Sequence, residues 1–387
     1  MTRTLQFLGI AALAVAFQLP AFAKCPISDG TTVIVRAPVG NLRVDTTGRD
    51  AVDITVTTDL AVKENCGRDR IEYTADAPGQ FRGTIDWKIL VPRTVNLDLV
   101  TYGGNITVGD SDGAVKLRTT GGSVTVGRIK GKTAIISQAG FIKTGDLGDD
   151  AEMRISSAGA IEIGSVAGNA DLHTAGGPIT TGFVNGKVTA EASGGSIYIK
   201  GAHGEVAVDA EPGDIYVGDA ARINAKSAGG SITNPRVRGP FHGETESGNI
   251  RLDQAGSWVE ATTGYGSIVV RMVPESFDGD LHMNLQSGVG DVTIYIPERM
   301  RATIDATVER PAMNARRIIS EFPMNGLASN APVPNRRGTR AIPAVTPPPS
   351  VNRFLSPVHE QGVIQGGGNQ IQLHTSLGKI EIFKIRM

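Results

Sequence analysis

A glycine recurs about every 18 residues along much of this chain, and this period constrains the fold more than any other feature. The recurring glycine is usually the second residue of a pair of small residues, as in Gly121-Gly122 and Ala139-Gly140. These marker glycines are Gly104, Gly122, Gly140, Gly159, Gly177, Gly195, Gly213, Gly230, Gly248 and Gly266. A fixed period of this length predicts a solenoid, in which each unit buries its apolar face only against neighbouring units.

Each unit contains two short segments in which apolar and polar residues alternate. The residue two positions after every marker is β-branched and aliphatic: Ile106, Val124, Ile142, Ile161, Ile179, Ile197, Ile215, Ile232, Ile250 and Ile268. The next residue is mostly polar, as at Thr107, Lys143 and Glu162. The other half of the unit alternates in the same way, as in "GAVKLRT" from Gly113. A period of two is typical of strands with one buried face.

The chain is therefore predicted to be an all-β protein, a single-stranded parallel β-solenoid (β-helix) with rungs of about 18 residues. Each rung supplies two strands, and the general preference of parallel connections favours a right-handed coil. Rungs stacked at about 4.8 Å would make ten units a rod about 48 Å long. Burial of the ten branched side chains would contribute roughly 15–30 kcal/mol before ordering costs. We expect this column to lie inside the rod.

A second column of small residues stands three positions before each marker. Its members are Thr101, Thr119, Ser137, Ser156, Thr174, Ala192, Ala210, Ser227, Thr245 and Thr263. We expect them to point inward near a turn, where their hydroxyl groups could form hydrogen bonds along the stack.

The first 23 residues have the pattern of a signal peptide. An apolar run from Leu8 to Leu19 is too short to span a bilayer, and Ala21-Phe22-Ala23 is a small-x-small cleavage pattern. No later stretch approaches the ~18 uncharged apolar residues of a membrane helix. We therefore expect an exported protein of the periplasm or cell surface, with no transmembrane segment.

The two cysteines and the net charge indicate a disulfide and limit the classes of partner to expect. Cys25 and Cys66 are the only two cysteines, and in an oxidising compartment one disulfide between them is the simplest interpretation. Lys and Arg number 38 and Asp and Glu 39, a net charge of −1 that becomes −2 without Arg3. Because this balance has no excess of basic residues, nucleic acid is excluded as an expected partner.

The remaining chain divides around the regular repeats at residues 101–297. Residues 24–100 are strand-like but less regular, and we expect an N-terminal β cap that covers an open sheet edge. Residues 298–365 are expected to be an irregular segment with a Pro/Arg-rich excursion. Residues 366–387 have the rung pattern again and should form closing β strands at the end of the rod.

Sites for catalysis, metals or cofactors do not emerge from the sequence. The turns lack the third glycine and the aspartate of calcium-binding nonapeptide repeats, and the histidines form no column of metal ligands. Glu191 and Asp209 are one rung apart in one outward column, which leaves a catalytic carboxylate pair as an alternative. Tyr198 and Tyr216 stack in successive rungs; they form either a cross-strand aromatic pair or a surface that binds a sugar ring.

Several segments in a fixed order resemble a bacterial family of unknown function labelled putative adhesin. They are "LVPRTVNLDLVTYGGNITV", "GDVTIYIPERMRATIDATVER", "SEFPMN" and "GGGNQIQLHTSLGKIEI", and the resemblance covers Val91 to Phe383. It implies a β-solenoid associated with the cell envelope and without enzymatic activity, and it transfers no catalytic, cofactor-binding or metal-binding residue.

The expected function is that of a non-enzymatic, adhesin-like binding or structural module with an envelope polymer or protein as its partner. One alternative is a polysaccharide-active β-helix enzyme, a lyase or hydrolase. Another is a scaffold that self-assembles end to end, for which weak self-association would be the sign.

Overall fold

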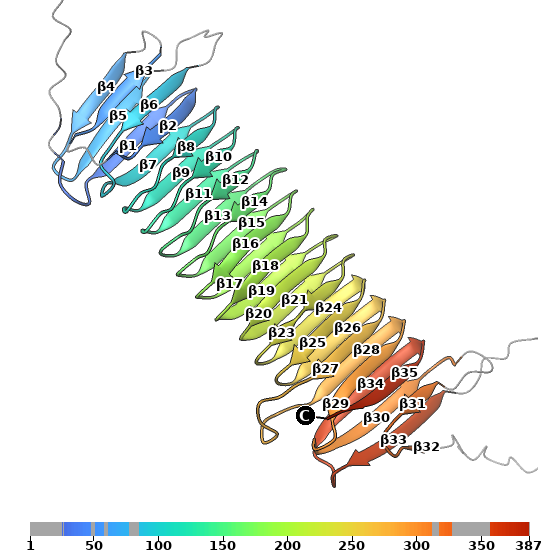
Figure 1. Cartoon of the computed structure of the whole chain (residues 1–387). Helices are drawn as coiled ribbons and strands as arrows, with labels where there is room; N and C mark the ends of the chain where they lie inside the picture. The colour runs from blue at the N-terminus through green and yellow to red at the C-terminus, as the bar shows by residue number, and fades with distance from the viewer. Residues whose placement is uncertain are drawn as a thin grey trace, which may run out of the picture.

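The computed structural model describes residues 25, 27–47, 51–57, 61–76, 85–311, 317–326 and 357–386. This part of the chain contains 35 strands and no helix, stacked in layers along one elongated rod (Figure 1). The prediction of an all-β parallel solenoid is confirmed. The expected signal peptide at residues 1–23 and most of the Pro/Arg-rich excursion lie outside the described residues.

One strand of every regular rung belongs to a sheet that we call sheet A. Consecutive members pair in parallel and in continuous register from one rung to the next. They are β7 (Asn96–Thr101), β9 (Val115–Thr119), β11 (Thr133–Ser137), β13 (Ala151–Ile155), β15 (Ala170–Thr174), β17 (Val188–Ala192), β19 (Glu205–Ala210), β21 (Arg222–Ser227), β24 (Phe241–Ser247), β26 (Val259–Tyr265) and β28 (Met283–Val289).

The second strand of each rung belongs to the facing sheet, sheet B, which is also parallel in the regular rungs. Its members are β8 (Ile106–Val108), β10 (Val124–Val126), β12 (Ile142–Thr144), β14 (Ile161–Ile163), β16 (Ile179–Val184), β18 (Ile197–Ala202), β20 (Ile215–Ala220), β22 (Ile232–Asn234) with β23 (Arg236–Val237), β25 (Ile250–Ala255), β27 (Ile268–Met272) and β29 (Val292–Pro297).

The core lies between the two sheets, and the predicted branched column runs through it. All ten of its residues, from Ile106 to Ile268, are at most 1% exposed. The adjacent inward column of sheet B accepts polar side chains at Thr144, Thr181 and Asn234, which are also buried. Asn234 Nδ2 donates hydrogen bonds to the carbonyls of Val217 and Gly218, at 2.7 and 2.6 Å. These bonds satisfy the amide nitrogen inside an otherwise apolar interior.

The small-residue column points inward as predicted, with one exception. Six of its hydroxyl groups donate to the carbonyl of the marker glycine in the preceding rung, at 2.7–3.4 Å: those of Thr119, Ser137, Thr174, Ser227, Thr245 and Thr263. Ser156 is exposed, so its expected inward position is wrong. Ile155 takes the place between Ser137 and Thr174, because the longer coil of this rung carries its extra residue between Ile155 and Gly159.

The marker glycines are needed where the chain turns from sheet A to sheet B. Gly104 and Gly122 have φ angles of +137° and +135°, a region that residues with a Cβ avoid. A Cβ at Gly122 would also collide with the carbonyl of Gly104 in the rung before it. The period read from the sequence is therefore set by a close backbone contact repeated at every turn.

At the N-terminal end of the rod, the order of the strands within each sheet differs from their order in the sequence. Its strands are β1 (Thr32–Ala37), β2 (Asn41–Asp45), β3 (Asp53–Val56), β4 (Val62–Cys66), β5 (Arg70–Ala75) and β6 (Asp86–Leu90). In sheet A, β1 lies between β5 and β7, and in sheet B, β2 lies between β6 and β8. Antiparallel β4 and β3 then pair with β5 and β6. The first rung of the chain is thus enclosed by later ones.

The C-terminal end repeats this arrangement and differs from expectation. Its strands are β30 (Ala302–Val308), β31 (Ile318–Ser320), β32 (Asn325–Gly326), β33 (Val358–Ile364), β34 (Asn369–Leu377) and β35 (Ile380–Ile385). The last strands do not close the rod, since β34 lies between β28 and β30 and β35 between β29 and β31. Antiparallel β33 covers β30. Part of the segment expected to be irregular, residues 298–365, therefore forms the outer layers.

The predicted disulfide is confirmed and fastens the N-terminal end. Cys25 is bonded to Cys66, 41 residues later, and Cys66 is the last residue of β4. The bond therefore ties the segment before β1 to the antiparallel strand at the edge of sheet A.

Beside the disulfide, Tyr73 of β5 is buried against β4. Its hydroxyl donates a hydrogen bond to Glu64 Oε1 at 2.7 Å, and the side chain is 6% exposed. Burial, followed by this bond to Glu64, raises the pKa of Tyr73 above its ordinary value. The phenol is therefore held protonated in the folded state.

We expect the stability of this end to fall at alkaline pH. A group whose pKa is raised on folding contributes its full stabilisation below its unfolded-state pKa, which is about 10 for Tyr. That stabilisation is lost as the pH rises through the folded-state pKa. Hydrogen exchange of β4 and β5 amides, corrected for its intrinsic pH dependence, should show their protection falling above about pH 10. This fall should be smaller in Tyr73→Phe than in the control Tyr102→Phe, whose tyrosine is 67% exposed. Equal losses in both variants would contradict the assignment.

Candidate functional site

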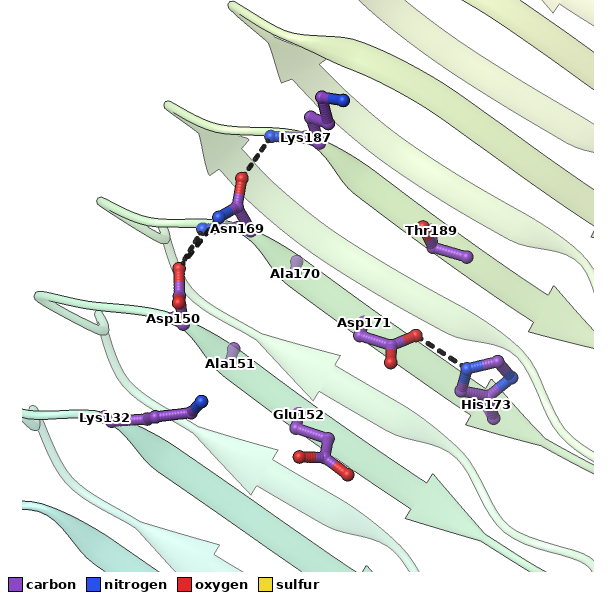
Figure 2. Close-up of a pocket in the computed structure, with 10 residues that line it drawn as sticks. All are labelled: Lys132, Asp150, Ala151, Glu152, Asn169, Ala170, Asp171, His173, Lys187 and Thr189. Atoms are coloured by element: carbon purple, nitrogen blue, oxygen red, sulfur yellow. Dashed lines mark hydrogen bonds and ion pairs between the residues drawn. The ribbon is translucent and has the colours of Figure 1, made fainter.

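The outward surface of sheet A is hollowed over strands β13, β15 and β17. The hollow has a volume of about 800 Å³ and is lined by Lys132, Asp150, Ala151, Glu152, Asn169, Ala170, Asp171, His173, Lys187 and Thr189 (Figure 2). Ala151 and Ala170 are inward residues of β13 and β15, 3% and 2% exposed, so they line the hollow from its floor. Longer polar side chains stand around these alanines.

One side of this hollow is a row of polar side chains located where the strands begin. Asp150 Oδ1 accepts hydrogen bonds from the backbone N and the Nδ2 of Asn169, at 2.8 and 3.0 Å. Asn169 Oδ1 accepts in turn from the backbone N of Lys187, at 2.9 Å. Figure 2 shows this row running from rung to rung. Because these bonds hold Asp150 and Asn169, the row has a fixed geometry.

The opposite side of the hollow contains a histidine held by two carboxylates. His173 Nε2 lies 2.6 Å from Asp171 Oδ1, and its Nδ1 lies 2.9 Å from Glu191 Oε2 on the next rung. A neutral imidazole donates to one carboxylate only, whereas a protonated one donates to both. With Lys132, Lys187 and Glu152 nearby, the hollow offers both signs of charge and several hydrogen-bonding groups to a polar ligand.

The carboxylates considered as a catalytic pair lie beside this hollow. Glu191 on β17 and Asp209 on β19 are register partners. Glu191 is bound to His173, and the next residue in the column after Asp209 is Lys226. The two carboxylates thus stand in a row of mixed charges on the outward face of sheet A. The absence of catalysis stays a prediction.

The two tyrosines singled out in the sequence are brought together on sheet B. Tyr198 and Tyr216 are register partners on β18 and β20, with ring centroids 4.6 Å apart and planes inclined by 6°. Tyr198 is 46% exposed. On its other side the register partner is the shorter Thr180, so the ring face turned away from Tyr216 has no aromatic neighbour in its column. The pair offers an aromatic surface in the middle of the rod.

Among the described residues, one group of three potential metal ligands lies close together. Cys25, Glu64 and Cys66 bring their ligand atoms within 4.8 Å of one another. The two sulfur atoms are joined in the disulfide, so they offer no thiolate to an ion. This grouping does not fit a metal site in the oxidised protein.

A second histidine cluster escaped the sequence analysis. Glu260 lies between two histidines, with its Oε2 3.1 Å from His242 Nδ1 and its Oε1 3.8 Å from His282 Nε2. The His282 ring stacks on Trp258, with centroids 5.3 Å apart. Because the two histidines occupy different columns of sheet A, counting positions within a rung does not bring them together.

Side-chain ladders at the turns were also missed. The residue after a marker glycine often accepts a hydrogen bond from the backbone N of the next rung. Examples are Asn105 to Ser123, Asp214 to Ser231 and Asn249 to Ser267, each at 2.8 Å. The signal was the recurrence of Asn, Asp or Ser directly after the marker, which are residues that bond to nearby backbone.

Among the described residues, no helix is long and apolar enough to cross a membrane.

Comparison with known proteins gives distant structural neighbours. No protein-family model matches the chain, and no curated protein matches it. A putative adhesin from Bacteroides fragilis has 14% sequence identity and a TM-score of 0.20, with 70% of this chain and 94% of that one covered. A putative cell adhesion protein from Clostridium sporogenes has 9% identity and a TM-score of 0.17, with 92% and 94% covered.

Both neighbours are described as adhesion proteins, like the family that the sequence resembles. With identities below 25% and TM-scores this low, they assign neither an activity nor a partner to this chain.

Proposed function

We propose that this chain is an exported, non-enzymatic module of the bacterial envelope that binds an envelope polymer along the outward face of sheet B. The stacked Tyr198–Tyr216 pair, in which Tyr198 is exposed and Tyr216 is half-buried, carries this proposal. The face of a tyrosine ring packs well against the apolar face of a sugar ring, and its hydroxyl group still bonds to water or to the ligand. An adhesin-like role is also what the sequence resemblance implies.

The construction of the rod supports binding to an extended ligand. Thr180 and Thr233 flank the tyrosine pair in the same outward column, so the aromatic rings extend beyond their shorter neighbours. The rungs repeat at about 4.8 Å, so a polymer along the rod axis meets a new side chain at each rung. Weak contacts that one polymer chain makes with successive rungs reinforce one another, because each contact raises the effective concentration of the polymer at the next rung.

Export is supported by the N-terminal pattern and the disulfide. The segment before Cys25 has the composition of a signal peptide, and disulfides persist in oxidising compartments. Export would be tested by fractionating cells that express the full chain and determining the N-terminal residue of the mature protein. A cytosolic chain with both cysteines reduced would contradict it.

Co-sedimentation with the insoluble envelope fraction, stripped of protein, would test polymer binding. We expect residues 24–387 to sediment with it and the double variant Tyr198→Ala/Tyr216→Ala to bind about tenfold more weakly, because centrally exposed aromatic contacts dominate binding free energies. The matched control is Tyr102→Ala, which removes an exposed tyrosine from another part of the rod. Failure of the wild-type chain to sediment, or equal binding by the double variant, would overturn the proposal.

The enzymatic alternative is tested on the same polymer. We expect the wild-type chain to release neither new reducing ends nor the unsaturated uronates that a lyase produces. If cleavage is measured and Glu191→Gln or Asp209→Asn abolishes it, the non-enzymatic proposal is wrong.

A further inference from the structure

A second hollow lies on sheet B, two rungs beyond Tyr216 toward the C-terminal end of the rod. It has a volume of about 640 Å³, and its lining includes Arg251, Asp253, Gln254, Val269, Arg271 and Tyr295. These residues come from β25, β27 and β29, three successive rungs.

The hollow is located where one strand of sheet B is a residue shorter than the strand before it. On β25, Asp253 and Gln254 both stand between the inward residues Leu252 and Ala255, whereas on β27 Arg271 stands alone between Val270 and Met272. The register of the two strands shifts at this point. Such a bulge bends its strand and redirects side chains, which is why bulges often lie next to binding sites. Here it places an extra polar side chain at the edge of the hollow.

Two arginines line this hollow, and they differ in how far their charge is balanced. Arg251 Nε lies 2.9 Å from Asp253 Oδ1, so this charge is paired. Arg271 is exposed and makes no ion pair or side-chain hydrogen bond with another residue in the part of the chain that the structure describes. A guanidinium group presents its donors in a planar fork that matches a carboxylate. Arg271 therefore provides an unoccupied position for an anionic group.

An aromatic ring and an apolar surface lie beside this cation. Tyr295 is the register partner of Arg271 on the next strand, and its half-buried ring stacks on Phe383 with centroids 5.2 Å apart. Val269 is half-buried next to the arginines. Gln254 adds an amide that can both donate and accept hydrogen bonds. A planar cation, an aromatic ring and an amide together fit a ring that carries a charge and hydroxyl groups.

We propose that this hollow binds a carboxylated sugar residue, with its carboxylate on Arg271 and its ring against Tyr295. The inference rests on the proposed function for the ligand being a polymer. It deepens that function because Arg251 belongs to the same outward column as Tyr198 and Tyr216, with Thr233 between. Tyr216 and Arg251 are two rungs apart, about 10 Å. One acidic polysaccharide along sheet B would reach both places.

Calorimetric titration of the purified mature chain with tetragalacturonate tests the site. We expect Arg271→Gln to weaken binding about tenfold, the usual effect of losing a charge-assisted hydrogen bond. Arg251→Gln should weaken it less, because Asp253 already shares that charge. The matched control is Arg222→Gln, an exposed arginine on sheet A without an ion pair among the described residues, and it should bind as the wild type does. Circular dichroism should show all three variants folded.

Two further ligands separate the contributions of charge and ring. The methyl ester of tetragalacturonate should bind wild type and Arg271→Gln equally and weakly, since the carboxylate is blocked. Polyglycerol phosphate, which is anionic but has no sugar ring, should bind more weakly than tetragalacturonate. Three results would each overturn the inference: equal affinity of wild type and Arg271→Gln for tetragalacturonate, wild-type binding of the ester as tight as that of tetragalacturonate, or wild-type preference for polyglycerol phosphate.

This titration contains no envelope material, so its failure is distinguishable from failure of the proposed function. A chain that sediments with the envelope polymer but does not bind tetragalacturonate retains the proposed function and loses this site. A chain that binds tetragalacturonate through Arg271 but does not sediment retains the site and loses the envelope role.

Discussion

Replacing Val124 by Asp is expected to prevent the rod from folding as a single unit. Val124 is 0% exposed and stands between Ile106 and Ile142 in the branched column. A carboxylate at this position would be buried without a partner, a cost of about 4 kcal/mol or more. In a solenoid each rung is stabilised only by its neighbours, so the defect would also uncouple the rungs on either side.

Urea unfolding followed by circular dichroism measures this effect. The matched control is Thr125→Asp, which places the same group on the next residue, exposed on the outward face of sheet B. We expect the control to change the free energy of unfolding by no more than about 0.5 kcal/mol. Equal unfolding midpoints for the two variants would mean that the column does not face the core.

Deletion of Ile371 to Met387 should make the chain form concentration-dependent aggregates. These residues include most of β34 and all of β35, which lie inside the C-terminal end. Ile371, Leu373, Ile380 and Ile382 are at most 1% exposed, and their burial contributes about 6–12 kcal/mol before ordering costs. Without them, β30 and β31 lose their parallel partners, and the edges of β28 and β29 become open to other chains.

Sedimentation velocity over a range of concentrations tests this expectation. The control is Leu377→Ser, a change in the same strand at a residue that is 44% exposed, and it should remain monomeric like the full chain. A truncated chain that stays a folded monomer would contradict the interior position of β34 and β35. Concentration-dependent oligomers of the full chain, abolished by the deletion, would instead favour end-to-end assembly through these strands.

Much of the central rod could be predicted because its sequence repeats the same local rules. The alternation around Ile142, Ile161 and Ile179 specifies which face is buried, and the marker glycines specify where the chain turns. Tyr198 and Tyr216 could be paired by counting because the interval between their rungs is regular. Where a coil is longer, counting fails: the spacing from the marker predicts an inward Ser156, but Ile155 occupies that position.

The sites on the rod are made by side chains from different rungs. Counting positions along the sequence does not reveal which of these side chains meet. The link from His242 through Glu260 to His282 crosses different columns of sheet A. The hollow at Arg271 exists because β25 carries one more outward residue than β27, which became visible only when the strands were paired. Neither arrangement has a local motif, since each is made by side chains from separate rungs.

By itself, the sequence determined the solenoid, its two strands per rung, its buried column and the disulfide partners. These features follow from local periodicity, close backbone contacts at glycine and the presence of only two cysteines. Only the tertiary structure decided the order of the rungs at both ends, where β1 and β34 lie inside later or earlier layers. A strand with the rung pattern can pair with any parallel neighbour of the same pattern, so the choice among neighbours is made by long-range packing.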